Sequence, residues 1–212
     1  MYTLYYSPGA ASMVIHLALL ETGMAHELRL VDTSAGQQRS PDYLKLNPNG
    51  LVPTLLVDGK PYFEAAAGLM TIADRHPEAG LAPERDSAAR PAWNQWILHL
   101  ANTVQPAFRL WFYPTDLADS EEHQAAIKEG VRRVIETAWT RLDRHLAANG
   151  PYLLGSAFSA PDLMLLMLMR WSRNMPKPAT EWPALRRLAD LVRARPSWAR
   201  LYEVEGLTEW QA

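Results

Sequence analysis

The first third of the chain alternates short runs of β-forming residues with stretches of helical periodicity. Gly23 follows the first helical run, as a glycine commonly does at a helix end. Asp58-Gly59 separates two β-type runs and favours a tight hairpin. The resulting order is βαβαββα. In chain order we expect a strand at 3–6, a helix at 11–22, a strand at 26–31, a short helix opened by Ser40-Pro41, strands at 52–57 and 60–63, and a helix at 64–76.

Beyond about residue 87 the pattern is helical only. Apolar residues recur at helical spacing from Trp93 to Trp111, and Pro106 within that stretch should kink the helix and free the carbonyl four residues back. A long helix is predicted from Ser120 to Asn149. Ser159-Ala160-Pro161-Asp162 resembles a capping box, and the run 163–169 that follows is apolar on all sides, which predicts a core helix.

This change of pattern predicts two domains. Residues 1–76 form an α/β domain, residues 77–87 read as a linker rich in proline, glycine and charge, and residues 88–212 form an all-helical domain.

Composition narrows the range of functions. The chain has 21 Lys and Arg residues against 23 Asp and Glu residues, so it has no excess of positive charge to bind phosphate groups. We therefore do not expect nucleic acid to be its main partner. The chain has no cysteine, which excludes disulfides, thiolate metal sites and a cysteine nucleophile and fits a reducing cytoplasm. No apolar run approaches the length of a membrane span. A secretory signal begins with basic residues, and no Lys or Arg precedes Arg29. The histidines are scattered along the chain, so we expect no metal site.

The order of elements, taken with several local motifs, resembles a cytosolic glutathione S-transferase, most closely the bacterial beta-like branch. The resemblance covers nearly the whole chain. It implies a thioredoxin-like first domain with a mixed four-stranded sheet, an all-helical bundle as the second domain, and a homodimer. The motifs that carry it are residues 4–9 (LYYSPG), residues 47–55 (NPNGLVPTL), Gly155 with 159–162 (SAPD), and residues 182–185 (WPAL) with Arg195-Pro196.

The resemblance also implies how glutathione would bind. A cis bond before Pro53 would leave the backbone of Val52, which follows Leu51, free to pair with the cysteinyl residue of glutathione. Glu64 and Ala65 would hold the γ-glutamyl end at a helix N-terminus. The family has a hydroxyl where this chain has Ala65, so we expect binding to be weaker by about 1.5–3 kcal/mol. An ordinary turn proline and a first-turn acid are the alternative interpretations of Pro53 and Glu64.

Activation of the thiol is the main departure from the family. In the beta-like branch a cysteine stands just after the Ser-Pro-Gly turn, and that place is Ala11 here. By resemblance to other branches, Ser12 is the first candidate to stabilise the thiolate and Tyr6 the second, with the free helix amides around Ala11 contributing. The alternative is that Ser12 only starts a helix and Tyr6 only packs a strand.

Further candidates lie outside these motifs. Gln38 or Arg39 would serve the glycyl carboxylate. Gln105 stands where the beta-like branch has a histidine, and it has no acid–base chemistry near neutral pH. An aromatic wall after Pro106 would suit an apolar co-substrate, although aromatic residues at this spacing also pack cores. The predicted wall consists of Phe108, Trp111, Phe112 and Tyr113.

The sequence therefore predicts a cytoplasmic, homodimeric glutathione transferase that adds the glutathione thiolate to a small apolar electrophile, a detoxification chemistry. Glutathione is the co-substrate and no metal takes part. The alternative is a binding or scaffold protein that kept the fold and lost the chemistry, as the residues at Ala11, Ala65 and Gln105 suggest.

Overall fold

The computed structural model describes residues 1–210, which form two compact units. The first unit combines residues 1–84 with residues 193–210, and the second comprises residues 85–192. The C-terminal segment thus packs with the α/β part, whereas the sequence pattern grouped it with the other helices. The segment forms a helix, as its periodicity predicts, but periodicity does not show against which domain a helix packs.

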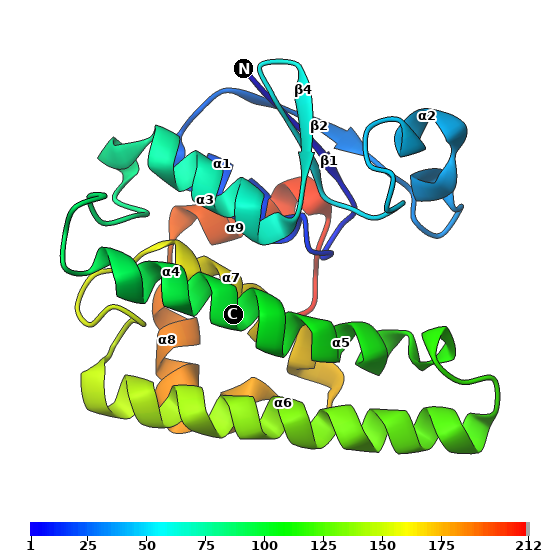
Figure 1. The fold of residues 1–212 in the computed structure, drawn as a ribbon. Helices are drawn as coiled ribbons and strands as arrows, with labels where there is room; N and C mark the ends of the chain where they lie inside the picture. Colours follow the sequence, from blue (N-terminus) through cyan, green and yellow to red (C-terminus); the bar gives the residue numbers. More distant parts are fainter. Residues whose placement is uncertain (211–212) are drawn as a thin grey trace. The chain divides into compact units, whose positions relative to one another are not determined.

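The first unit is built on a mixed four-stranded sheet in the order β2-β1-β3-β4 (Figure 1). β1 and β2 are parallel, whereas β1 with β3 and β3 with β4 are antiparallel, as the predicted order of elements requires. The elements of this unit are β1 (Tyr2–Tyr6), α1 (Met13–Thr22), β2 (His26–Leu30), the short α2 (Pro41–Leu44), β3 (Thr54–Val57), β4 (Lys60–Phe63), α3 (Ala65–Arg75) and α9 (Pro196–Glu205).

The hairpin between β3 and β4 turns at Asp58-Gly59, as predicted. Asp58 has φ 53° and Gly59 has φ 82°. Positive φ at both central residues matches the right-handed twist of the strands, and aspartate and glycine tolerate it best. This turn fixes the register in which Thr54 faces Phe63.

Helix α1 is the centre of the first unit. Every residue from Met13 to Leu19 is buried, because the helix packs on the sheet as well as against α3 and α9 (Figure 1). The approach of α3 depends on Gly68: a Cβ at this position would lie 2.4 Å from Cδ1 of Ile15. The helix ends at Gly23 with φ 65°, as the sequence indicated.

Two polar clusters fasten α9 to α1, one at each end. At the start of α9, Arg195 donates from Nε and Nη2 to the two carboxylate oxygens of Glu21 at 2.8 and 2.6 Å, and the Ser197 hydroxyl also donates to Glu21. Burial alone would raise the pKa of Glu21, but these hydrogen bonds and the Arg195 charge lower it on balance. At the other end, Glu205 contacts the turn before α1. These contacts explain why the last helix belongs to the first unit.

The second unit consists of helices joined by loops, with two isolated β-bridges between residues 152 and 157. A π-helical segment, Leu100–Val104, joins its first two helices immediately before Pro106, so the predicted interruption is present. None of the helices in residues 1–210 is long and apolar enough to cross a membrane. The main helices of the unit are α4 (Arg90–His99), α5 (Gln105–Phe112), α6 (Glu121–Asn149), α7 (Ala160–Trp171) and α8 (Pro183–Arg193).

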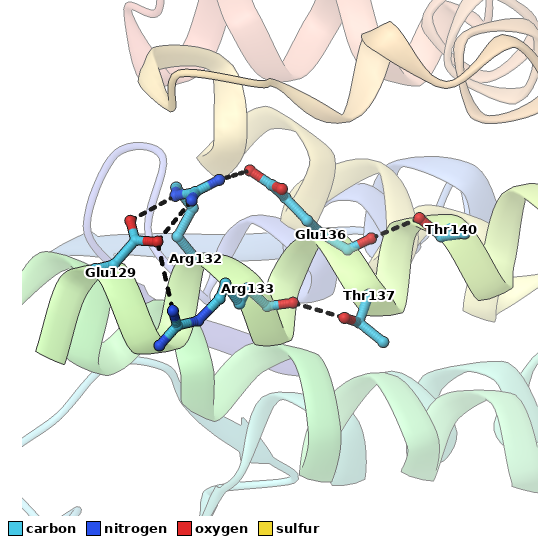
Figure 2. A network of polar contacts seen from close by, with 6 residues as sticks. All are labelled: Glu129, Arg132, Arg133, Glu136, Thr137 and Thr140. Atoms are coloured by element: carbon cyan, nitrogen blue, oxygen red, sulfur yellow. Dashed lines mark hydrogen bonds and ion pairs between the residues drawn. The ribbon is translucent and has the colours of Figure 1, made fainter.

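A network of charged and hydroxyl side chains links successive turns along α6 (Figure 2). Arg132 bonds Glu129 at 2.7 and 2.9 Å and also reaches Glu136 one turn further on, and the Arg132 bonds lower the pKa of Glu129. Thr137 and Thr140 donate to carbonyls of the preceding turn. Ion pairs open to solvent add little stability, and Glu129 and Arg133 are the most exposed charged members of this network, whereas Thr140 also accepts from Nε1 of Trp182 at 3.1 Å.

Helix α7 is the buried core helix predicted from its all-apolar sequence. Every residue from Ala160 to Arg170 is buried. At its start the carboxylate of Asp162 accepts hydrogen bonds from the Ser159 amide at 2.8 Å and from the Leu153 amide at 2.9 Å. The carboxylate of the predicted capping box therefore reaches back as expected, and it also fastens the preceding loop.

Candidate functional site

The strand register places several predicted site residues at one edge of the sheet. Tyr5 in β1 lies opposite Thr54 in β3, and Thr54 lies opposite Phe63 in β4. The residues that adjoin this row are Tyr6, Pro53 and Glu64, so the end of β1, the approach to β3 and the start of α3 meet there. The Val52-Pro53 bond is cis, as the family resemblance implies.

The turn from β1 into α1 is closed by Ser12. Its hydroxyl donates to the Ser7 carbonyl at 3.1 Å and accepts from the Ser7 amide at 3.2 Å, and the side chain is fully buried. A hydroxyl has one proton to donate. The Ser12 hydroxyl would have to break its bond to Ser7 before it could donate to a thiolate, so the structure gives this side chain the task of holding the turn.

We expect Ser12→Ala to lower the free energy of unfolding by about 1–3 kcal/mol, because it leaves a buried amide without an acceptor. Urea unfolding measures the change. Ser34→Ala is the matched control, since Ser34 is exposed and bonds the side chain of Asp32 in the same unit. Equal stability of the two variants would contradict the structural role of Ser12.

Backbone amides face the place where the beta-like branch has its cysteine. Within residues 1–210, the amides of Ala11 and Ser12 have no hydrogen-bond acceptor, and Ala11 is partly exposed. They lie just before Met13, the first residue of α1. Unpaired amides at a helix start favour an anion, both through their N–H groups and through the helix dipole.

A buried carboxylate lies directly behind this turn. Glu205 of α9 accepts from the Gly9 amide at 2.8 Å and bonds Nδ1 of His16 at 2.8 Å, and neither the Glu205 nor the His16 side chain is open to solvent. Tyr6 lies over the His16 ring, with centroids 6.2 Å apart. Burial first, and the Glu205 charge second, raise the pKa of Tyr6, so its phenol stays protonated at neutral pH and remains a hydrogen-bond donor.

Glu64 has an unusual backbone conformation that the sequence did not reveal. It has φ 75° and ψ 113° immediately before α3. A residue with a side chain rarely adopts positive φ, and such outliers collect at functional sites. The conformation leaves the amides of Ala65 and Ala66 at the open first turn of α3, where an anion would be stabilised. The methyl group of Ala65 itself is buried and supplies no hydrogen-bonding group.

Gln38 lies near the loop before β3. A Cβ placed on Gly50 would be 3.3 Å from the Gln38 carbonyl, so the segment with Gln38 and Arg39 packs against the residue before Leu51. Oε1 of Gln38 is buried and, among the described residues, has no hydrogen-bond partner. The structure therefore brings Gln38 to the same sheet edge as Leu51 and Val52.

The predicted pocket residues of the second unit lie in different surroundings. Phe108 is fully buried and its ring meets Phe112, Trp139 and Trp171 at centroid distances of 5.8–6.1 Å, so it is part of the core. The Lys128 ammonium lies 5.8 Å from the ring of Trp111. Phe112 is 45% exposed, Tyr113 is 52% exposed and Gln105 is partly exposed. The four predicted residues therefore do not form one continuous open wall.

The edge of the first unit can thus hold an extended anion. It offers unpaired amides at two helix starts, a free backbone at Val52 and a neutral phenol. The described residues contain no group of three His, Asp or Glu side chains placed to hold a metal ion. Sequence reasoning missed Glu205 and His16, although both are polar residues on otherwise apolar helix faces, which was the available signal.

Two family descriptions match the chain. Residues 1–74 match "Glutathione S-transferase, N-terminal domain", and residues 124–203 match "Glutathione S-transferase, C-terminal domain".

The chain is also similar to individual proteins of known sequence or structure. A glutathione S-transferase of Xanthomonas campestris is 34% identical over 171 residues, which cover 81% of this chain and 82% of that protein. A maleylacetoacetate isomerase of Pseudomonas aeruginosa is 25% identical over 213 residues, covering 95% and 94%. The structure of a sphingomonad glutathione S-transferase complexed with glutathione is 33% identical, with a TM-score of 0.84 and coverage of 97% and 100%.

Proposed function

Because the chain belongs to the glutathione S-transferase family, we propose that it binds glutathione at the sheet edge of its first unit and adds the thiolate to a small apolar electrophile. The observation that carries the proposal is the set of unpaired amides at Ala11 and Ser12, which lie beside the end of β1 where the thiol of glutathione would stand.

The thiolate is stabilised by the backbone and not by a protein thiol. The chain has no cysteine, so mixed disulfides with the protein do not form. Amides at a helix N-terminus lower the pKa of a thiol from about 8.5. Ser12 contributes through its amide while its hydroxyl holds Ser7, and the protonated phenol of Tyr6 is the second donor. After the thiol proton has left to solvent, the thiolate attacks the electrophilic carbon and forms a carbon–sulfur bond. In an addition the π bond of the electrophile breaks and its electron pair takes a proton from solvent, whereas in an aromatic substitution the leaving group departs with the electron pair of its bond.

Glutathione is held along its length by groups from three segments. Val52 pairs with the cysteinyl backbone, beside Leu51 and Pro53. The start of α3 at Glu64 and Ala65 receives the γ-glutamyl carboxylate. Gln38 lies toward the glycyl end. These assignments follow the family, and the shared sheet edge supports them.

Calorimetric titration with reduced glutathione, combined with an aromatic electrophile assay on the same sample, tests the proposal. We expect a dissociation constant in the micromolar to millimolar range together with turnover. Absence of glutathione binding would contradict the proposal outright. Binding without turnover would favour the second candidate, a glutathione-binding scaffold, to which Ala11, Ala65 and Gln105 point because they lack the usual polar groups.

Ala65→Ser should strengthen glutathione binding. The new hydroxyl stands at the first residue of α3, and one added hydrogen bond to a charged carboxylate contributes about 1.5–3 kcal/mol. The dissociation constant should fall at least tenfold in calorimetry. Ala66→Ser one residue further on is the control, and equal effects of the two substitutions would argue against a γ-glutamyl site at Ala65.

The nature of the second substrate separates two activities. Because one relative is a maleylacetoacetate isomerase, glutathione-assisted isomerisation of an unsaturated acid is a second candidate activity on the same site. In that reaction glutathione is regenerated, whereas conjugation consumes it. Measurement of free thiol before and after turnover with each substrate class distinguishes them.

We further propose that the protein acts as a cytoplasmic homodimer. The absence of cysteine fits a reducing cytoplasm. The dimer is proposed because the chain belongs to this family. Light scattering at micromolar concentration should give twice the mass of one chain, and a monomer would contradict the dimer.

A further inference from the structure

Two buried side chains hold the peptide group between Leu51 and Val52 from one side. Tyr43 donates its hydroxyl to the Leu51 carbonyl oxygen at 2.8 Å, and Asn47 donates from Nδ2 to the same oxygen at 2.8 Å. Only 5% of Tyr43 and 2% of Asn47 are exposed. A carbonyl that accepts two bonds from buried donors has little freedom to turn.

The direction of this carbonyl fixes the direction of the next amide. The peptide bond after Leu51 is trans and planar, so its C=O and N–H point in opposite directions. With the Leu51 oxygen directed inward to Tyr43 and Asn47, the Val52 N–H is directed outward. This N–H has no acceptor among residues 1–210, and it lies before Thr54, the first paired residue of β3.

We propose that Tyr43 and Asn47 are positioning residues for glutathione, which aim the Val52 N–H at the carbonyl of the cysteinyl residue by fixing the Leu51–Val52 peptide. This inference rests on the proposed function, because it concerns how the same site recognises its ligand. Neither side chain touches glutathione in this scheme, and both act through one rigid peptide group.

The two donors are themselves firmly oriented. The Thr54 hydroxyl shares a hydrogen bond with the Tyr43 oxygen at 2.9 Å, and the Tyr5 ring meets the Tyr43 ring edge-on at 5.9 Å. Since the Tyr43 proton goes to Leu51, Thr54 is the donor in their pair. Burial raises the pKa of Tyr43, which keeps that proton in place at neutral pH.

The orientation of the Asn47 amide is also determined by its neighbours. Its Oδ1 accepts from the Asn49 amide at 3.1 Å, so Nδ2 must be the atom that faces the Leu51 oxygen. The Asn47 carbonyl accepts from the Gly50 amide at 3.0 Å, which closes the loop. Replacement of Nδ2 by an oxygen would therefore set two acceptors against each other without changing the shape of the side chain.

Two variants, Tyr43→Phe and Asn47→Asp, test the inference by calorimetry and steady-state kinetics with reduced glutathione. We expect Tyr43→Phe to raise the dissociation constant about fivefold to tenfold, the equivalent of one lost hydrogen bond. Asn47→Asp should raise it more than tenfold, because the carboxylate repels the Leu51 oxygen. KM for glutathione should rise by the same factors, whereas kcat at saturating glutathione stays near the wild-type value.

Tyr2→Phe is the matched control. Tyr2 is equally buried, its hydroxyl bonds Nε2 of His76 at 2.8 Å, and it lies at the opposite end of β1. Its removal should cost similar stability and leave glutathione affinity unchanged. Amide hydrogen exchange adds a direct signal: glutathione should protect the Val52 N–H in the wild type and in Tyr2→Phe, and less in Tyr43→Phe.

The outcomes separate the inference from its premise. A wild-type protein that does not bind glutathione overturns both. A wild-type protein that binds, with Tyr43→Phe binding as tightly as Tyr2→Phe and Val52 equally protected, overturns the positioning role alone. If Asn47→Asp fails to fold, the comparison of Tyr43→Phe with Tyr2→Phe still decides the matter.

Discussion

Glu205→Ala should lower the free energy of unfolding by about 2–5 kcal/mol, because it removes a buried acceptor that serves two donors. The carboxylate accepts from the part-buried Gly9 amide and bonds Nδ1 of His16, whose buried ring would lose this partner. Each buried donor without an acceptor costs about 1–3 kcal/mol. The end of α9 would also lose its contact with the turn that presents the Ala11 and Ser12 amides, so glutathione affinity should fall as well.

Urea unfolding and calorimetry measure the two effects. Glu203→Ala is the matched control, because Glu203 lies two residues earlier in α9, is exposed and pairs only with Arg200 within the described residues. Its stability should stay within about 0.5 kcal/mol of wild type. Glu205→Gln keeps an acceptor oxygen and should fall between the two. If Glu205→Ala unfolded with the same midpoint as Glu203→Ala, Glu205 would not fasten α9 to α1.

The second large effect is expected at Asp162, in the helical unit. Asp162→Ala removes the acceptor of the Ser159 and Leu153 amides and of the Ser159 hydroxyl, the last at 3.3 Å. Because each buried donor left alone costs about 1–3 kcal/mol, we expect a loss of about 3–5 kcal/mol in unfolding free energy. Because α7 is buried along nearly its whole length, we expect the whole second unit to be destabilised and not only the start of this helix.

The control for this variant is Asp116→Ala. Asp116 is an exposed aspartate of the same unit whose carboxylate bonds Nε of Arg109 at 2.7 Å. Its removal should change stability by less than about 1 kcal/mol. Urea unfolding followed by tryptophan fluorescence distinguishes the two, and a small effect at Asp162 would show that α7 does not depend on its cap.

Much of the fold follows from local sequence signals. Gly23, Asp58-Gly59, Ser120 and Pro106 mark boundaries through backbone chemistry that acts within a few residues, and the structure confirms each. The assignment of α9 to the first unit did not follow, because it depends on Glu21 and Glu205 meeting residues that are 174 and 196 positions away in the sequence. Short-range patterns carry no information about such contacts.

The candidate site was predictable in position but not in detail. The motifs around Val52, Glu64 and the turn before α1 come together at one sheet edge, since strand order and register follow from the element pattern, and their role in binding stays a prediction. The bonds of the Ser12 hydroxyl and the positive φ of Glu64 were not predictable, because each depends on a few tenths of an ångström or a single torsion. Phe108 was a pocket candidate because it belongs to a group of aromatic residues after Pro106, but its ring is fully buried, which matches the alternative that aromatic residues at helical spacing pack a core.

The most direct test of the account is the ionisation of glutathione bound to the wild-type protein. Ultraviolet absorbance of the thiolate, followed as a function of pH at saturating glutathione, gives the pKa of the bound thiol. With the Ala11 and Ser12 amides as stabilising groups, we expect this pKa to lie clearly below the free value of about 8.5. A bound thiol that titrates at the free value would contradict the central claim that backbone amides at the start of α1 replace the missing cysteine.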